Sequence, residues 1–228
     1  MKKILFALTS HALKGNTGQA TGFYLSEAAH PWAILNDAGY EIDFVSPLGG
    51  KPPMDGADAA STDAVCKRFL ETPTVMQKLN NSFKPAQIKS ADYAAILFVG
   101  GHGTMWDFPD NQALGQHAAE IYESQGVVAA VCHGPAALVN IKLSDGKYLL
   151  QGKRVAAFTD DEERAVELDK VVPFLLATRL QQRGAQHIAA ANWQKNVVVD
   201  QRLVTGQNPA SATGVGEEIL QLLKAAKS

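Results

Sequence analysis

Short apolar runs alternate with longer amphipathic segments along most of this chain. Five of the runs have the length and composition of buried parallel strands. They are KILFALT at 3–9, EIDFVSP at 41–47, YAAILFVGG at 93–101, GVVAAVC at 126–132 and RVAAFT at 154–159. Strands that alternate with helices predict an α/β fold, in which a mainly parallel central sheet carries helices on both faces.

The longer segments carry the signals that helices need. They cover residues 26–39, 110–126, 160–184 and about 211–224. Gly39 and Gly126 end the first two segments and are suitable C-terminal caps. The third segment opens with acids and closes with arginines, an order that complements the helix dipole. Pro173 lies inside this third segment and should kink the helix or split it in two.

The stretch HIAAANWQKNVVVDQRLVTG at 187–206 has a different pattern. It predicts short strands with a turn near Asp200 and Gln201, and so a small antiparallel edge near the C-terminus. Residues 46–61 are rich in proline and glycine and are expected to form a loop. The chain has no repeats and no linker, so one domain over 1–228 is expected.

Charge and cysteine content limit the possible functions. The net charge is −2, from 21 basic and 23 acidic residues that are scattered along the chain. This pattern excludes a nucleic-acid footprint and attraction to an anionic membrane surface. No run approaches the about 18 apolar residues of a membrane span. Two cysteines cannot form a disulfide framework, and we expect a cytoplasmic protein.

The first fifteen residues, MKKILFALTSHALKG, contain a basic tip and a short apolar run. Thr9, Ser10 and His11 interrupt that run, and no small-residue cleavage site follows. A first strand is therefore favoured over a signal peptide.

Cys132 lies where the fourth apolar run ends, in the sequence AVCHGP. Small residues around a nucleophile at a strand-to-helix turn are typical of a nucleophile elbow. The amides of the following helix are expected to lower the thiol pKa. The alternative is a small buried hydrophobe, which is the expectation for Cys66. His133 is a candidate general base, although adjacent side chains at a turn diverge, and its backbone N–H is a candidate oxyanion donor.

A second glycine-rich turn, Gly100-Gly101-His102-Gly103, follows the third apolar run. Glycines let backbone N–H groups approach a ligand, so Gly101 is a candidate for the second oxyanion donor. An ordinary tight turn is the alternative. A phosphate loop is excluded because no Gly-Lys-Ser/Thr follows.

Taken together, these motifs resemble the ThiJ/PfpI superfamily, also called the DJ-type family, over nearly the whole chain. The segments that carry the resemblance are GFYLSEAAHPW, FVSPLGGKPPMD, VGGHGTMWDFPDN, AAVCHGPAAL and LVTGQNPASA. They are most similar to the branch described as glyoxalase III enzymes and holding chaperones. The resemblance implies a flavodoxin-like sandwich and a single domain related to the class I glutamine amidotransferases. It also implies a homodimer.

The resemblance assigns roles to individual residues. The family cysteine and histidine fall on Cys132 and His133. The family glutamate that bonds the thiolate falls on Glu27. A second acid pairs with the histidine, and this falls on Glu163, with Glu162 as the alternative. Without the resemblance, these acids would be solvated groups at helix starts.

Other residues are candidates for the substrate pocket. Backbone and side-chain contacts to substrate are expected from Gly101, His102, Gly134, Trp106 and Trp193, with Tyr24 and His30 as further candidates. His117 is expected on a helix surface. No His and Cys cluster has the spacing of a zinc site, so we expect no required metal and no cofactor.

A nucleophilic thiol beside acids, a histidine and backbone donors predicts chemistry on carbonyl groups. The expected reaction converts methylglyoxal or glyoxal to D-lactate or glycolate through a hemithioacetal on Cys132, without glutathione. The same site could remove early glycation adducts from proteins. The alternatives are a stress-response holding chaperone, a cysteine redox sensor, and a cysteine amidase or peptidase.

Overall fold

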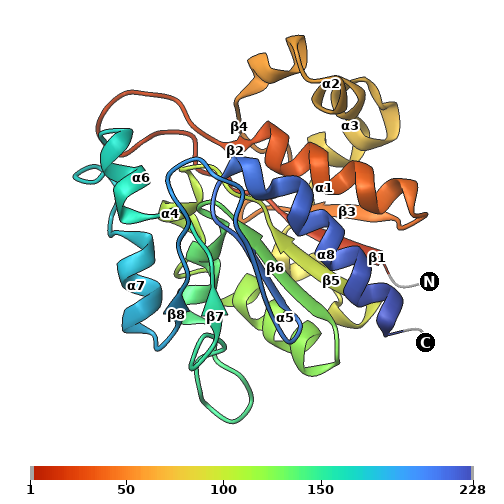
Figure 1. The fold of residues 1–228 in the computed structure, drawn as a ribbon. Helices are drawn as coiled ribbons and strands as arrows, with labels where there is room; N and C mark the ends of the chain where they lie inside the picture. The colour runs from red at the N-terminus through yellow and green to blue at the C-terminus, as the bar shows by residue number, and fades with distance from the viewer. Residues whose placement is uncertain (1–2, 227–228) are drawn as a thin grey trace.

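The computed structural model describes residues 3–226 of the chain. Its centre is a six-stranded sheet with the order β3-β1-β5-β6-β10-β9 (Figure 1). The strands are β1 Lys3–Ala7, β3 Ile42–Val45, β5 Tyr93–Phe98, β6 Val127–Val131, β9 Val197–Asp200 and β10 Leu203–Gly206. Neighbouring strands are parallel except for β9 and β10, which are antiparallel. The predicted α/β fold with a small antiparallel edge is confirmed.

Both faces of the sheet are covered, because successive side chains of a strand point to opposite faces. In β1, Ile4 and Phe6 enter one core, while Leu5 and Ala7 enter the other. Helices α1, Leu25–Asp37, and α8, Ala212–Ala225, pack side by side over the first core (Figure 1). Helices α5, Gln112–Glu123, and α7, Leu176–Gln182, contribute to the second.

The segment between β3 and β5 extends beyond the sheet. It contains β4, Met54–Asp55, which pairs with β2, Phe23–Tyr24, and the two helices α2, Ala64–Glu71, and α3, Pro73–Asn80. The expected loop at 46–61 therefore includes a short strand. Short 3-10 helices complete the connections at Ala57–Ser61, Pro85–Gln87, Ser90–Asp92, Gly134–Asn140 and Pro209–Ser211.

The prediction of a fifth sheet strand at 154–159 is wrong. Strand β7 is only Arg154–Val155, and it pairs with β8, Gln186–His187, in a separate two-stranded sheet. The position beside β6 is occupied by β10. The chain after β7 crosses the end of β10 instead, where the Ala156 N–H donates to the Thr205 hydroxyl at 2.9 Å.

The helix expected over 160–184 is two short helices. Helix α6 is Asp160–Ala165, and its first turn is capped by the Thr159 hydroxyl, which accepts from the Glu162 N–H. The helix ends well before Pro173, because Glu167 has the left-handed value φ +59°. Irregular backbone then connects it to α7.

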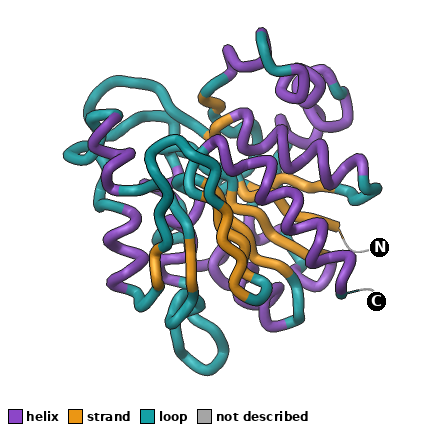
Figure 2. The backbone as a smooth tube through the Cα atoms, in the orientation of Figure 1, coloured by secondary structure: helices purple, strands orange, loops and turns teal. Residues whose placement is uncertain are grey.

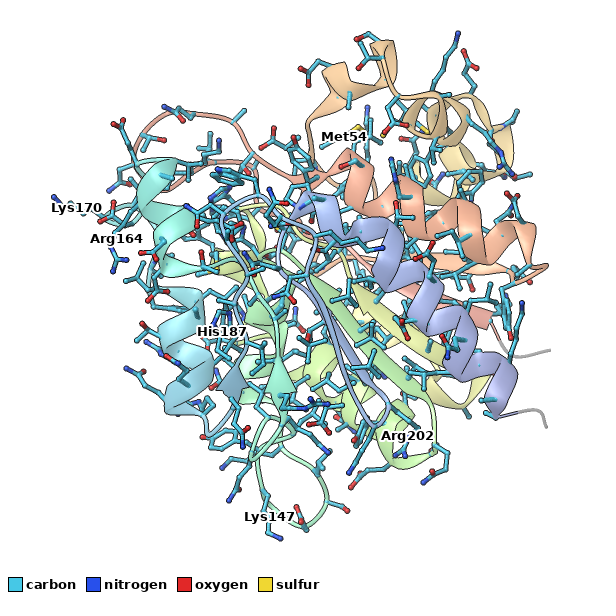
Figure 3. All side chains as sticks on the ribbon, in the orientation of Figure 1. Met54, Lys147, Arg164, Lys170, His187 and Arg202 are labelled. Atoms are coloured by element: carbon cyan, nitrogen blue, oxygen red, sulfur yellow. The ribbon has the colours of Figure 1, made fainter. Side chains whose placement is uncertain are left out.

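The remaining features are a projecting loop and the C-terminal turn. The loop at 141–153 extends from the body of the protein (Figure 2), and Lys147 lies at its end (Figure 3). The turn between β9 and β10 includes Gln201, with φ +57°, as the sequence predicts. Among the helices within residues 3–226, none combines the length and apolar content that crossing a membrane requires.

Candidate active site

Cys132 lies at the carboxyl end of β6, at a backbone turn that only small neighbours permit. Its φ is +60°, a strained conformation for a residue with a side chain. A Cβ on Gly100 would lie 2.8 Å from the Cys132 Cβ, and one on Gly134 would lie 2.2 Å from the Phe98 carbonyl oxygen. The elbow geometry expected from AVCHG is therefore present, followed by a 3-10 helix rather than an α-helix.

His133 connects the cysteine to an acid. Its Nδ1 lies 3.3 Å from the Cys132 Sγ, and its Nε2 lies 2.7 Å from the Glu163 Oε2. The expectation that the adjacent side chains diverge is wrong, because the left-handed turn at Cys132 brings both to one side. Glu163 comes from α6 and is almost completely buried. Cys132, His133 and Glu163 thus lie in a continuous row of side-chain contacts, which is the geometry that a nucleophile, a base and an orienting acid require.

Glu163 also binds His102, so its carboxylate lies between two imidazoles. The Glu163 Oε1 lies 2.8 Å from the His102 Nε2, and the two rings are 4.0 Å apart. Burial raises the pKa of Glu163, but the charge that the imidazoles carry when protonated, that of His133 above all, and the hydrogen bonds from His102 and His133 lower it to about 2. Burial and the neighbouring His133 lower the pKa of His102 to about 4. A neutral His102 then donates its Nε2–H to Glu163, which leaves Nδ1 as an acceptor.

Glu162, the residue before Glu163, connects neighbouring segments of the fold and does not hydrogen-bond to His133. Its Oε1 accepts from the Trp193 N–H, the Gln207 Nε2 and the Asn208 Nδ2, and its Oε2 accepts from the Thr159 N–H. These bonds join α6 to the segment around Trp193 and to the loop after β10. Glu163, not Glu162, therefore pairs with His133.

Glu27 lies on the other side of the thiol. It comes from the first turn of α1 and is fully buried, facing the Cys132 thiol and the Gly100 N–H. Neither carboxyl oxygen has a hydrogen bond of ordinary length within residues 3–226. Burial raises the pKa of Glu27 to about 8, although the thiol and the amide act against this rise. Glu27 is therefore a neutral acid at pH 7, able to donate a proton.

The thiol itself is harder to ionise than the sequence predicts. Burial raises the pKa of Cys132, and the charge that Glu27 carries when ionised raises it further. The His133 N–H acts in the opposite direction. The expectation of a lowered thiol pKa is wrong, because it counted the helix amides but neither the burial of the sulfur nor the facing carboxyl group of Glu27.

These groups open into a pocket of about 420 Å³. Its walls come from the loop between β1 and β2 and from residues 166–171, which lie side by side in Figure 1. Arg164 and Lys170 point away from the body of the protein (Figure 3). The lining includes Lys14, Thr17, Gln19, Tyr24, Glu27, Asp55, Gly101, His102, Cys132, His133, Phe158, Val166, Leu168, Val171 and Trp193.

The structure brings most of the expected site residues together, but not all of them. Gly134 packs beneath the turn against Phe98. Trp106 does not line this pocket and stacks on His11, with ring centroids 5.1 Å apart. His30 lies outside the pocket as well.

Sequence reasoning missed Phe158, whose ring lies 4.3 Å from that of His133. It also missed Thr104, whose hydroxyl lies 2.9 Å from the Gly101 carbonyl oxygen and 3.0 Å from that of His133. Thr104 thereby ties the two glycine-containing turns together. No motif marks either residue, because each acts through a contact between distant segments.

Within residues 3–226, two groups of side chains have the composition and proximity of metal ligands. One is His102, His133 and Glu163 in the pocket, and the other is His30, Asp63 and Cys66 outside it. Each set comes from segments far apart in the chain, so sequence spacing could not reveal either. The pocket group needs no metal to explain its geometry, because Glu163 already bonds both imidazoles.

Comparison with known proteins agrees with this architecture. Residues 19–222 match the model of the DJ-1/PfpI family. The chain belongs to the DJ-1/PfpI family. Among members of this family, the glutathione-independent glyoxalase HSP31 of Saccharomyces cerevisiae is 34% identical, over 98% of each chain.

Two solved structures of DJ-1/PfpI relatives superpose over nearly the whole chain. Rapid Encystment Protein 24 kDa of Francisella tularensis is 40% identical with a TM-score of 0.93, over 98% of this chain and 99% of that one. Glyoxalase III of Candida albicans is 31% identical with a TM-score of 0.86, over 97% of each chain. The flavodoxin-like fold predicted from the sequence is thereby confirmed.

Proposed function

We propose that this protein is a glutathione-independent glyoxalase that converts methylglyoxal to D-lactate and glyoxal to glycolate. The observation that carries the proposal is the environment of Cys132. A protonated carboxylic acid, Glu27, faces the thiol on one side, and the His133–Glu163 pair contacts it on the other. The similarity to a yeast glyoxalase and to Candida glyoxalase III supports the same reaction.

The first step is formation of the carbon–sulfur bond. His133 Nδ1 takes the thiol proton, and the imidazolium is stabilised by Glu163. The Cys132 sulfur attacks the aldehyde carbon, and Glu27 donates its proton to the carbonyl oxygen. The His133 N–H and the turn at Gly101 hold that oxygen as charge develops. The product is a hemithioacetal, and Glu27 is now a carboxylate.

The second step moves a proton between two carbons. Glu27 removes the hydrogen of the former aldehyde carbon while the His133 imidazolium protonates the ketone oxygen, which gives an enediol. Glu27, whose proton exchanges with solvent through the pocket, then delivers a proton to the neighbouring carbon, and the hydroxyl of the sulfur-bearing carbon gives its proton to His133. The result is a lactoyl thioester on Cys132. Water hydrolyses this thioester, lactate leaves, and the thiol recovers its proton. Each general acid–base step can contribute about 10²–10⁴-fold to the rate. Glutathione is unnecessary because Cys132 supplies the thiol.

His102 is the second base of the pocket. Its Nε2–H bonds Glu163, and His102 lines the cavity. Because its lowered pKa keeps the ring neutral, Nδ1 can accept a hydrogen bond from the hydroxyl of the hemithioacetal. His102 therefore orients both Glu163 and the bound substrate.

One observation favours a second candidate function. The 3.3 Å contact between His133 and the Cys132 sulfur is the contact that a cysteine amidase or peptidase needs. A hydrolase has no use for a protonated acid such as Glu27 on the opposite side of the thiol. Activity of Glu27→Gln on peptides or amides, without activity on methylglyoxal in the wild type, would favour the hydrolase.

The experiment that tests the proposal is lactate formation from methylglyoxal without glutathione. Lactate itself must be measured, because lysine, arginine and cysteine side chains consume methylglyoxal by forming adducts. Cys132→Ser is compared with the matched variant Cys66→Ser, since Cys66 is buried and lies outside the pocket. We expect lactate from the wild type and Cys66→Ser and none from Cys132→Ser. Equal rates in the two variants would refute the proposal.

A further inference from the structure

A second cluster of reactive side chains lies between α1 and α2, outside the catalytic pocket. It consists of His30, Asp63 and Cys66, which we call the α1–α2 cluster. One ligand atom from each residue lies within 4.8 Å of the others. His30 comes from the middle of α1, Asp63 is the N-cap of α2, and Cys66 lies three residues further on.

Asp63 divides its two oxygens between two tasks. Its Oδ1 accepts hydrogen bonds from the Val65 N–H at 2.8 Å and the Cys66 N–H at 3.1 Å, which caps α2. Its Oδ2 lies 2.6 Å from the His30 Nε2. A cation bound by Oδ2 would therefore leave the helix cap intact.

His30 has a second partner that suits metal binding. Its Nδ1 lies 2.8 Å from the hydroxyl of Thr213 in α8. A hydroxyl can donate or accept, so it serves either tautomer of the ring. With Nδ1–H donating to Thr213, the Nε2 lone pair faces the cluster. Histidines that bind metals nearly always have such a partner on the other ring nitrogen.

The sulfur completes a set of soft and borderline ligands. The Cys66 side chain, on the inner side of α2, is fully buried, and the polar group that faces its thiol is the Asp63 carboxylate. The side chains of His30 and Asp63 are 27% and 28% exposed, which leaves a route from solvent. One sulfur, one imidazole nitrogen and one carboxylate oxygen suit tetrahedral zinc, with water as the fourth ligand.

We propose that His30 Nε2, Asp63 Oδ2 and Cys66 Sγ bind a zinc ion that ties α2 to α1 and α8. On binding, the thiol releases its proton to solvent, and the imidazole proton lies on Nδ1. The His30 and Asp63 atoms must separate from 2.6 Å. Two ligands about 2.0 Å from a tetrahedral zinc are about 3.3 Å apart, so this pair opens by under an ångström, while the sulfur, now within 4.8 Å of both atoms, closes on the ion. Because the site lies outside the pocket that holds Cys132, the ion would join α1 and α2 without taking part in the proposed reaction at that thiol.

Cobalt is the probe, because a thiolate bound to Co²⁺ gives a charge-transfer band in the near ultraviolet. The titration uses full-length Cys132→Ser, which removes the thiol of the catalytic pocket. Any Co²⁺ on His102, His133 and Glu163 then lacks that band. We expect one equivalent of Co²⁺ to produce the band, visible-region absorption of tetrahedral type, and displacement by Zn²⁺.

Two further variants on this background decide the site. Cys66→Ser should abolish the band. Asp63→Asn keeps a residue that caps helices equally well but removes the anionic ligand. It should fold as its parent does, by circular dichroism, and bind Co²⁺ at least about tenfold more weakly. If Cys66→Ser fails to fold, Asp63→Asn still decides the question.

Thermal unfolding gives an independent measurement. Zinc at one hundred times its Kd should raise the Tm of Cys132→Ser by roughly 5–10 °C, and the same zinc concentration should raise that of the Asp63→Asn double variant by no more than about half as much. The proposal is overturned if Cys132→Ser gives no thiolate band, if the band survives Cys66→Ser, or if Asp63→Asn binds as tightly as its parent.

Discussion

Replacement of Glu27 by glutamine should stabilise the protein at neutral pH while it removes the proposed catalytic acid. The carboxyl group of Glu27 is fully buried, and burial raises its pKa from 4.5 to about 8. Between these values the folded protein holds a proton that the unfolded chain has released. The contribution of Glu27 to stability is thus greatest below pH 4.5 and is lost as the pH rises to about 8.

The size of the effect follows from the same pKa values. Each pH unit within this window costs about 1.36 kcal/mol, so the cost is about 3 kcal/mol at pH 7 and approaches about 5 kcal/mol at pH 9. Glutamine has nearly the same shape as the neutral acid and does not titrate. For a chain of this size, a gain of about 3 kcal/mol corresponds to a rise in Tm of up to roughly 6–12 °C.

The assay is urea unfolding of the wild type and Glu27→Gln at pH 5, 7 and 9. Glu71→Gln, which removes an exposed carboxylate from α2, is the matched control. The difference in unfolding free energy between Glu27→Gln and the wild type should grow with pH, while the control difference stays flat. A Glu27→Gln difference that is zero, or the same at all three pH values, would refute the burial argument.

Three further predictions concern the acids of the site. Glu163→Gln should lower kcat by about 10²–10⁴-fold, because one amide cannot accept hydrogen bonds from both imidazoles. Asp161→Asn, which changes an exposed acid of the same helix, should have little effect on kcat, and equal kcat values for the two variants would contradict the role assigned to Glu163. Glu162→Gln should lower the free energy of unfolding by about 2–4 kcal/mol, measured in urea, because the new amide nitrogen would face N–H donors. An unchanged free energy of unfolding would be inconsistent with the four hydrogen bonds that the Glu162 carboxylate accepts. The kcat/KM for methylglyoxal should fall as the pH rises above about 8, where Glu27 loses its proton; a profile that keeps rising to pH 10 would argue against Glu27 as the acid.

The central sheet could be predicted from the sequence where a strand is buried on both faces. The runs around Phe6, Phe44, Leu97 and Val128 have that character. The run at 154–159 has the same composition, yet most of it is not strand. Composition shows that a segment is buried, whereas which strand pairs with β6 depends on contacts across the whole fold.

Site residues were predictable to the extent that a local motif marks them. Cys132 and His133 follow from the elbow, and Glu27 and Glu163 from the family pattern. The raised pKa of the Cys132 thiol was not predictable, because it results from burial and from Glu27, which is distant in sequence. The α1–α2 cluster was hidden for the same reason, since its ligands belong to two helices.

The most direct test of the proposed chemistry is the proton NMR spectrum of lactate formed from methylglyoxal in D₂O. An enediol on Cys132 predicts that solvent deuterium enters at the carbon next to the methyl group, so the methyl signal of lactate is a singlet. The reaction with Cys132→Ser should give no lactate above buffer. A methyl doublet throughout the product would show that the hydrogen of the aldehyde carbon is retained, which would contradict an enediol whose added proton has exchanged with solvent. Lactate at the wild-type rate from Cys132→Ser would contradict it as well.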